Sequence, residues 1–284
     1  MARHKILTFT LMYFIQAWTL GVDSKMVNLH QPDLITLDMV PDSVDDMYNG
    51  CTENMYNKVE KEYLPNENNT GGIFQKAWKG AQACADNVTQ RFTKDNSEYN
   101  SEDKLTNDHI KAICAYSGSQ TKIYEVFNQA VRTNRTEYTT SFQFHSLHFL
   151  LTDALRLLKE NQHGCHTTYR RTRMLFNSTV NQTMRFGFFA SSSFLTNLTH
   201  FGEISCFNIT TCSGAYLKSY PVLGKKEKEV LIPPFEMFKI IKKEKGKHVN
   251  DCQHLYELES VGLQSNLNCK AVEENTLFKL SVSQ

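Results

Sequence analysis

The spacing of apolar residues changes near Cys165, and this change limits the fold more strongly than any other feature of the sequence. Before it, apolar residues recur every three or four positions, as on one face of a helix. The clearest run extends from Phe144 to Leu158. Further helices are predicted from about Cys51 to Leu64, where Pro65 would end the helix, from about Phe74 to Val88, and from about Lys122 to Val131.

After Cys165 the sequence consists of short β-branched and aromatic runs separated by polar or glycine-containing turns. The predicted strands are Met184–Phe189, Glu203–Thr210, Glu229–Ile232, Phe235–Ile241 and His254–Leu258. We therefore expect an α+β fold in which a helical half, about 34–160, packs on a mainly antiparallel, β-sandwich-like half, about 161–273. Because no internal repeat or low-complexity linker divides these halves, they are expected to form one domain.

The first 21 residues have the pattern of a secretory signal peptide. Arg3 and Lys5 precede an apolar stretch from Ile6 to Leu20, and Gly21 offers a cleavage point. The mature chain would then be a single domain of residues 22–284. Removal of the two basic residues changes the formal charge from +1 to −1, which leaves no overall positive field to hold nucleic acid.

Two further features indicate export. Eight cysteines, without any C-x-x-C motif, favour disulfides over metal or redox chemistry. Seven asparagines stand in N-x-S/T glycosylation motifs: Asn68, Asn87, Asn134, Asn177, Asn181, Asn197 and Asn208. Residues 275–281 contain neither a membrane-spanning run nor the apolar tail of a lipid-anchor signal. We expect a secreted, glycosylated monomer.

Two acidic residues mark a segment that the pattern predicts to be a strand, from Glu227 to Ile232, ended by Pro233 and Pro234. Side chains alternate along a strand, so Glu227 and Glu229 would point the same way. Paired carboxylates raise each other's proton affinity and can divide acid and base roles beside a cationic transition state. An exposed, solvated pair is the common alternative for such a motif.

No glycine-rich phosphate-binding motif is present, so a nucleotide would need other contacts. The arginines of the strand-like segment Tyr169-Arg170-Arg171-Thr172 could bind a diphosphate through their planar donor groups, or form surface ion pairs. A second segment, residues 185–193, is an aromatic strand that ends in three serines. Such serines can also simply terminate the sheet by local hydrogen bonding.

In this order, Tyr-Arg, aromatic-x-Ser-Ser-Ser and Glu-x-Glu-Val-Leu-Ile-Pro-Pro resemble the vertebrate arginine-specific mono-ADP-ribosyltransferases, ecto-enzymes with an R-S-ExE signature. The resemblance extends from about residue 35 to about residue 270. It includes residues 37–51 as the mature amino terminus, Phe144 to Leu158 as the central helix, and the T-C-x-G-A segment at 211–215. Arg171 departs from the glycine that many members carry, and its side chain could crowd the nicotinamide amide.

The resemblance implies roles for particular residues. Arg170 would bind the diphosphate of NAD, and Ser191 would hydrogen-bond the nicotinamide ribose. Glu229 would be the principal catalytic carboxylate, stabilising an oxocarbenium-like sugar. Glu227 would orient the acceptor guanidinium and receive its proton. The residues that match family positions near the NAD pocket, with packing or surface roles as alternatives, are Tyr116, Gln182 and Ser219.

The resemblance also implies two disulfides, Cys165–Cys212 and Cys51–Cys269. For the remaining cysteines we expect Cys84–Cys114 to join two helices and Cys206–Cys252 to join two strands. His145 and His148 lie three apart on the predicted central helix, and His163, Cys165 and His166 lie just beyond its end, so these residues could form a zinc site. A disulfide at Cys165 would remove the thiolate ligand, so no metal is expected.

Taken together, the resemblance implies transfer of ADP-ribose from NAD, or NADP, to arginine side chains of extracellular proteins, with release of nicotinamide. An NAD glycohydrolase would use the same residues with water as the acceptor, and the presence of Glu227 argues against it. A non-catalytic secreted binding protein is favoured by Arg171 and by the adjacent glycosylation motifs at Asn177 and Asn181. The intact Arg170, Ser191 and Glu229 argue against that alternative.

Overall fold

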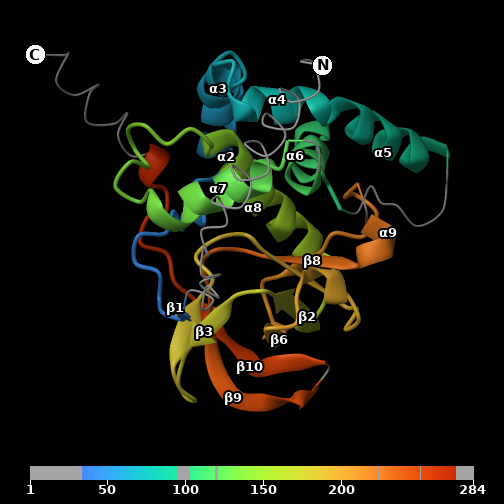
Figure 1. The fold of residues 1–284 in the computed structure, drawn as a ribbon. Coiled ribbons are helices and arrows are strands. Elements are labelled where there is room, and N and C mark those ends of the chain that lie inside the picture. The colour runs from blue at the N-terminus through green and yellow to red at the C-terminus, as the bar shows by residue number, and fades with distance from the viewer. Residues whose placement is uncertain (1–33, 95–102, 119–120, 223, 250, 273–284) are drawn as a thin grey trace, which may run out of the picture. The chain divides into compact units, whose positions relative to one another are not determined.

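The computed structural model describes residues 34–94, 103–118, 121–222, 224–249 and 251–272. The predicted signal peptide lies outside the described residues. Helices occupy one side of the described chain and a large sheet the other (Figure 1). This arrangement confirms the predicted α+β class, with the helices drawn mainly from the first half of the sequence.

The helical layer contains one long central helix surrounded by shorter ones. Its elements are α2 (Thr52–Lys58), the π-helix η1 (Val59–Tyr63), α3 (Leu64–Glu67), α4 (Ile73–Gly80), α5 (Gln82–Lys94), α6 (Asn107–Ser117), α7 (Ile123–Thr133) and α8 (His145–Glu160). Twelve residues of α8 are buried, because the other helices cover it on one side and the sheet covers it on the other. No helix among the described residues is long and apolar enough to cross a membrane.

Two helix predictions differ in detail from the structure, and one helix was not predicted. Pro65 does not end its helix: α2, η1 and α3 follow one another without a break as far as Glu67, and Pro65 stands just after the π-helical turn η1. The run from Phe74 to Val88 is divided between α4 and α5, since Gly80, a poor helix former, ends α4. The bounds of α6 were not predicted, because its capping box pairs Thr106 with His109 instead of the usual glutamate or glutamine.

The strands form one eight-stranded sheet and a separate two-stranded ribbon. They are β1 (Leu34–Thr36), β2 (His166–Thr172), β3 (Leu175–Asn177), β4 (Thr183–Arg185), β5 (Ala190–Ser193), β6 (Ser205–Thr211), β7 (Ala215–Tyr216), β8 (Glu229–Ile232), β9 (Glu236–Val249) and β10 (Cys252–Leu263). The large sheet has the order β4-β9-β10-β6-β2-β5-β8-β7, and β1 pairs with β3. All neighbours in the large sheet are antiparallel except β10 and β6, which agrees with the expected mainly antiparallel sheet.

The predicted strand Met184–Phe189 is wrong in its second half, since β4 stops at Arg185. Gly187 has a φ of +69°, a left-handed conformation that breaks the strand. A Cβ at Gly187 would lie 2.6 Å from the side chain of Val40, so the amino-terminal segment packs directly on this backbone. The chain then re-enters the sheet as β5, which carries Ser191.

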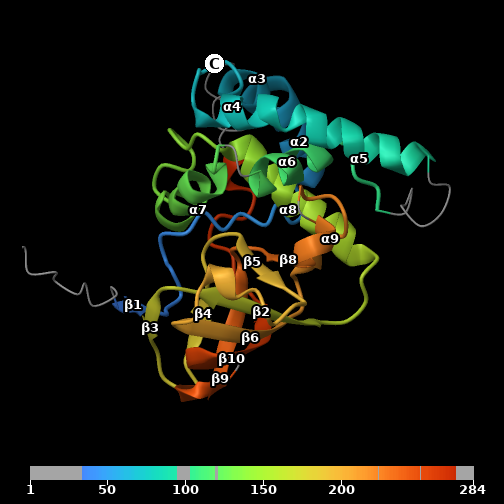
Figure 2. The ribbon, with the colours of Figure 1, turned by 45° about the vertical axis from the view of Figure 1, so that its right-hand side comes forward.

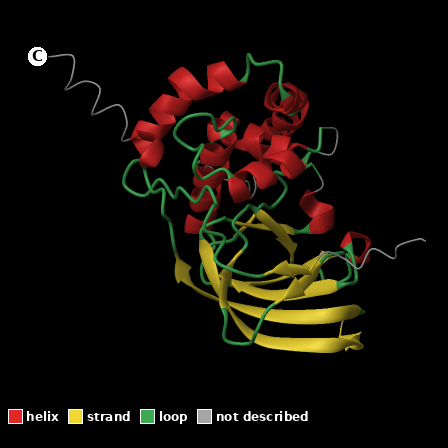
Figure 3. Ribbon diagram, turned by 60° about the vertical axis from the view of Figure 1, so that its left-hand side comes forward, coloured by secondary structure: helices red, strands yellow, loops and turns green. Residues whose placement is uncertain are grey.

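Strands β5 and β8 lie between the helices and the rest of the sheet (Figure 2). Alternate residues of these strands therefore belong to different cores: Leu231 packs in the large helical core, whereas Ala190 and Ile232 pack in a second core among the strands. Figure 3 shows the same two layers by secondary structure. Strands β5 and β8 therefore both rest on buried apolar side chains, and this packing fixes their backbone positions.

Four disulfides join the eight cysteines: Cys51–Cys269, Cys84–Cys114, Cys165–Cys212 and Cys206–Cys252. These are the expected pairs. The asparagines of the glycosylation motifs are exposed at positions 87, 177, 181 and 197 and half-buried at 68, 134 and 208. None is fully buried.

Candidate active site

Arg170 lies in β2, between β6 and β5 in the sheet. Its guanidinium Nη1 donates a hydrogen bond to the carbonyl of Ser191 at 2.6 Å. The guanidinium carbon also lies 5.8 Å from the centre of the Phe188 ring, within the range of a cation–π contact. Burial lowers the pKa of Arg170, but a guanidinium remains charged at any ordinary pH. The site therefore contains a fixed, half-buried positive charge.

Ser191 connects this arginine to the catalytic carboxylate predicted from the sequence. Its carbonyl accepts the bond from Arg170, while its side chain lies near enough to Glu229 and to the phenol of Tyr116 to lower the pKa of both groups. The following serines have structural contacts: Ser192 donates to the carbonyl of Val230 at 2.8 Å, and Ser193 donates to the carbonyl of Glu227. The three consecutive serines thus divide into one that faces the site and two that anchor the start of β8.

Glu229 is the first residue of β8 and is 9% exposed. Burial raises the pKa of its carboxyl from 4.5 to about 7, with a further raising contribution from the charge of Glu227. The hydrogen bond from Ser191 and the charge of Arg170 act in the opposite direction. A carboxyl with a pKa near neutral can change its protonation state under physiological conditions, which is typical of catalytic groups.

Glu227 does not lie in a strand, so the argument from strand alternation is wrong. It is the last residue of a short helix, α9 (Gly224–Glu227), and is half-buried. Lys228, with a φ of 45°, takes a left-handed turn between the helix and β8. The two carboxylates are nevertheless close enough for Glu227 to raise the pKa of Glu229. A turn, and not a common strand face, brings them together.

Tyr116, near the end of α6, contacts the candidate site from the helical layer. Its hydroxyl donates to the carbonyl of Phe189 at 2.7 Å and accepts a bond from Asn128 at 3.0 Å. Burial raises the pKa of Tyr116 to about 12, so the phenol stays protonated. Sequence reasoning missed Asn128, and also Arg132 four residues later on the same face of α7. The sequence did offer a signal: Asn128 and Arg132 are polar, lie four residues apart, and each directly follows a buried residue, Phe127 or Val131.

Gln182 and Ser219, which match family positions near the NAD pocket, and Arg171, which departs from the family, make contacts with other parts of the described chain. The side chain of Gln182 contacts the carbonyl of Leu37 and the amide of Thr179, so it is used within the turn before β4. The carbonyl of buried Ser219 accepts a bond from Arg91 of α5 at 3.3 Å. Arg171 alternates with Arg170 along β2 and donates to the carbonyl of Thr196 at 2.8 Å. Its side chain is therefore directed to the opposite face from Arg170 and is not placed to crowd the candidate site.

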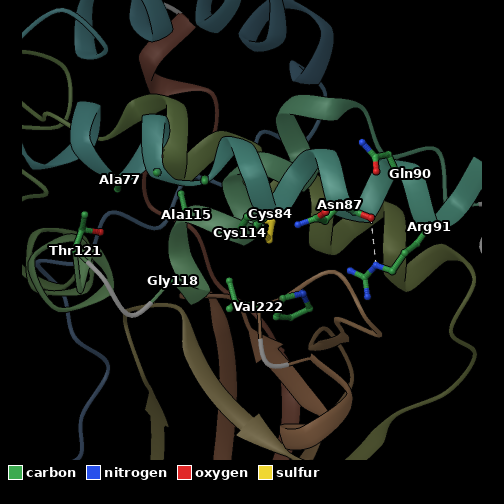
Figure 4. A pocket seen from close by; sticks show the side chains of 13 residues that line it. Ala77, Cys84, Asn87, Gln90, Arg91, Cys114, Ala115, Gly118, Thr121 and Val222 are labelled. Carbon is green, nitrogen blue, oxygen red and sulfur yellow. Dashed lines mark hydrogen bonds between the residues drawn. A yellow bond between two sulfur atoms is a disulfide. The ribbon is translucent and has the colours of Figure 1, made fainter.

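Two hollows in the described part of the molecule are candidates for a ligand-binding cavity. A cavity of about 150 Å³ contains Arg170 and Phe188 in its lining, together with Arg132, Asp38, Phe186 and other residues. A larger hollow of about 620 Å³ lies between α5, α6 and the loop at Pro221 and Val222 (Figure 4). Its lining includes neither Arg170, Ser191 nor Glu229. The smaller cavity adjoins the candidate site through Arg170 alone, since its lining includes neither Ser191 nor Glu229.

The described part of the chain contains no group of three or more histidine, cysteine or acidic residues arranged to hold a metal ion. Cys165 is in a disulfide. The ring nitrogens of His148 are engaged by the hydroxyl of Tyr48 at 2.7 Å and the carbonyl of Val44 at 2.9 Å. Burial lowers the pKa of His148 to about 3, so this histidine is neutral and structural.

Comparisons with known proteins agree with this geometry. A family model described as NAD:arginine ADP-ribosyltransferase matches residues 37–260. The GPI-linked NAD(P)(+)--arginine ADP-ribosyltransferase 1 of Mus musculus is 33% identical over 270 residues, which cover 89% of this chain and 80% of that protein. The erythroblast NAD(P)(+)--arginine ADP-ribosyltransferase of Gallus gallus is 32% identical over 246 residues, 84% of this chain and 77% of its relative.

Solved structures show the same likeness. The crystal structure of the eukaryotic mono-ADP-ribosyltransferase ART2.2 superposes with a TM-score of 0.68 at 30% identity, covering 83% of this chain and 98% of that one. An ART2.2 variant in complex with NADH gives a TM-score of 0.69 at 29% identity, with the same coverage of both chains. The similarity therefore includes nearly the whole of a solved enzyme domain.

Proposed function

The chain belongs to the NAD:arginine ADP-ribosyltransferase family, and on that basis we propose that it transfers ADP-ribose from NAD to arginine side chains of extracellular proteins, releasing nicotinamide. The observation that carries this proposal is the position of Ser191, whose carbonyl accepts a hydrogen bond from Arg170 and whose side chain lies near enough to Glu229 to lower the pKa of that carboxyl. One residue thus fixes a phosphate-binding cation and a buried carboxylate relative to each other. The relatives' names include NAD(P), so NADP is proposed as a second donor.

The proposed reaction begins with heterolysis of the bond between nicotinamide and ribose. The electron pair leaves with nicotinamide, which departs neutral, and the ribose acquires oxocarbenium character. Ionised Glu229 stabilises that positive charge electrostatically, as carboxylates do in glycoside hydrolysis. Arg170 holds the diphosphate so that the ribose stays beside the carboxylate. The low exposure of Glu229 strengthens its effect, because little water screens the interaction.

Glu227 is proposed to serve the acceptor. A guanidinium nitrogen attacks the anomeric carbon, and the proton that it loses goes to the Glu227 carboxylate. The half-exposed position of Glu227 suits contact with a protein substrate, whereas Glu229 is buried. Without an acceptor, water could attack at the same carbon, giving hydrolysis as the side reaction.

Secretion is also proposed. Four disulfides favour an oxidising compartment, and all seven glycosylation asparagines are exposed or half-buried. One relative is named as GPI-linked and another, from Mus musculus, as an ecto-ADP-ribosyltransferase. An extracellular or cell-surface location would expose the enzyme to proteins that carry accessible arginines.

A donor–acceptor assay tests this function. Purified protein is incubated with labelled NAD and agmatine, a small guanidine that mimics arginine. Labelled adduct is expected; free ADP-ribose alone would indicate a glycohydrolase, and neither product would indicate a binding protein. The same reaction with NADP tests the second donor.

Substitutions of the two acids test the proposed division of roles. Glu229→Gln should reduce nicotinamide release by about a hundredfold or more, because the neutral amide no longer stabilises the cation. Glu227→Gln should lose adduct while keeping part of the hydrolysis. Equal loss of both activities in Glu227→Gln would contradict separate roles for the two carboxylates.

A further inference from the structure

The larger hollow, of about 620 Å³, contains a glycosylation motif in its wall. One face of α5 forms this wall, because Cys84, Asn87 and Arg91 recur at spacings of three and four residues. Helix α6 and the loop at Pro221 and Val222 form the other sides (Figure 4). Asn87 is the first residue of an Asn-Val-Thr motif, and its side-chain nitrogen is the atom that carries the glycan in such motifs. The attachment point of a glycan therefore lies within the lining.

Asn87 differs from the other asparagines in these motifs. All seven are described, and Asn87 is the one that lines either of the two hollows. Its side chain is exposed and forms no hydrogen bond with another described residue, while its backbone carbonyl accepts a bond from Arg91 at 3.3 Å. The carboxamide is thus available for modification, and a glycan attached to it begins inside the hollow.

The lining suits a neutral sugar better than a charged ligand. Among its described residues it contains no carboxylate, and its single cation, Arg91, already donates to the carbonyls of Asn87 and Ser219 at 3.3 Å. Apolar surface comes from small side chains and from Val222, which is 52% exposed. A pyranose ring presents C–H groups on its faces, so it can cover apolar side chains while its hydroxyls stay hydrated. The volume falls within the range of about 300–1,000 Å³ that is usual for small-molecule sites.

The walls of the hollow are held in place by the protein itself. The disulfide Cys84–Cys114 joins α5 to α6 within the lining. The loop is tied to α6, since the amide of Val222 donates to the hydroxyl of Ser117 at 3.2 Å. A seat that is already formed requires little ordering of the protein when a glycan packs in it. A glycan in this position also covers the disulfide, whose Cys84 is half-buried.

We propose that this hollow seats the glycan of Asn87, whose first sugar rings pack against Val222 and cover the Cys84–Cys114 disulfide. The inference rests on the proposed secretion, since such glycans are added in the secretory pathway. There Nδ2 of the asparagine displaces the diphosphate from the first sugar of a lipid-linked oligosaccharide and loses one proton, so that a C–N bond replaces a C–O bond. The glycan then shields both its own attachment point and the disulfide beneath it.

Access of a glycosidase to the native protein tests the seat. Protein purified from the medium of cultured animal cells is treated with peptide:N-glycosidase F, which cleaves at the asparagine, and mass spectrometry of its peptides follows each site. Asn197 is the internal control, because it is exposed and lies outside both hollows. Release from Asn87 should be at least about tenfold slower than from Asn197 in the native protein, and within about threefold of it after denaturation and reduction.

Substitution of the apolar wall shows whether the hollow itself causes the protection. Val222→Ser removes the methyl groups that contact the sugar but keeps the backbone amide that donates to Ser117. Release from Asn87 should become at least about threefold faster, with release from Asn197 unchanged. Val261→Ser is the matched control, since Val261 is 48% exposed on β10 and lies outside the hollow. It should leave both rates within about twofold of the wild type.

The disulfide gives a second measurement. Its reduction by dithiothreitol is followed by alkylation of Cys84 and Cys114 and mass spectrometry. In Asn87→Gln this reduction should be about tenfold faster than in the wild type, because the reductant reaches the disulfide through the uncovered hollow. Asn197→Gln should leave the rate unchanged. An unchanged rate in Asn87→Gln would contradict the covering of the disulfide.

Equal native release from Asn87 and Asn197, or a Val222→Ser variant as resistant as the wild type, would overturn the seat. Glycans at other sites beside an unmodified Asn87 would overturn it too, while leaving the proposed secretion in place. A protein that carries no glycan at any of the seven asparagines would contradict both proposals.

Discussion

The ionisation of Glu229 follows from its immediate neighbours. Burial and the charge of Glu227 raise its pKa, while the hydroxyl of Ser191 and the charge of Arg170 lower it, and the result lies at about 7. The charged form is the one that stabilises a cationic sugar. Because the pKa of Glu229 lies near neutral pH, a small change in its surroundings alters the fraction of the enzyme that carries the ionised carboxylate.

This balance predicts a pH dependence. Below pH 7 Glu229 is mostly protonated, so nicotinamide release should increase with pH between about 6 and 8 and then level off. Glu227→Gln removes a negative charge that raises the pKa of Glu229, so the midpoint of the remaining hydrolysis should move to lower pH. Initial rates from pH 5 to 9 at constant ionic strength measure both midpoints. The exposed Glu203→Gln is the control, and a midpoint that moves upward in Glu227→Gln would contradict the assignment.

The central helix α8 begins without a capping side chain of its own. Its N-cap residue is Phe144, and the carboxylate of Glu67, at the end of α3, accepts bonds from the amides of His145 at 2.7 Å and Ser146 at 3.1 Å. The negative charge also lies at the positive end of the helix dipole. One element thus supplies the cap of another, and the position of α8 beneath the site depends on α3.

Glu67→Ala should lower the free energy of unfolding by about 2–4 kcal/mol, because two buried amides lose their acceptor. Glu60→Ala, an exposed glutamate of the adjoining η1, should change it by less than about 0.5 kcal/mol. Urea denaturation followed by circular dichroism measures both. Equal effects of the two substitutions would show that Glu67 does not cap α8.

The two ends of the described chain are tied together. Asp45 accepts from the amides of Asn266 at 2.8 Å and Leu267 at 3.1 Å, and Asp46 accepts from that of Cys269 at 2.9 Å. The disulfide Cys51–Cys269 closes the same contact across 218 residues. These bonds join the segment after β10 to the segment before α2. The end of the sheet is thereby tied to the start of the helical layer.

The long closure predicts a large contribution to stability. Replacing Cys51 and Cys269 by serine should cost about 5 kcal/mol in the chain-entropy treatment of a closed loop. The pair Cys84–Cys114, with a separation of 30, should cost roughly 2 kcal/mol less when it is replaced in the same way. Guanidinium denaturation of the two double variants gives the comparison. A greater loss for the shorter loop would show that closure entropy is not the main contribution.

Much of the fold could be predicted because the relevant patterns are local. Apolar spacing located α8 to within two residues, and β-branched spacing located β8, although the predicted strand also included Glu227. The predicted strand Glu203–Thr210 corresponds to β6. The errors arose where a single backbone conformation overrides the pattern, as at Gly187, which interrupts a strand, and at Lys228, which separates Glu227 from β8.

The sequence determines the chemical identity of each side chain, so the arginine, serine and glutamates of the candidate site could be named from their motifs. Their ionisation and most of their neighbours could not, because the groups that touch them come from distant parts of the chain: Phe188 beneath Arg170, Asn128 bonded to Tyr116, and Arg132 across the same cavity. Burial and electrostatic coupling depend on distances in space, and folding alone sets those distances. The pKa of Glu229 is therefore a property of the packed helices and strands, while its identity as a carboxylate belongs to the sequence.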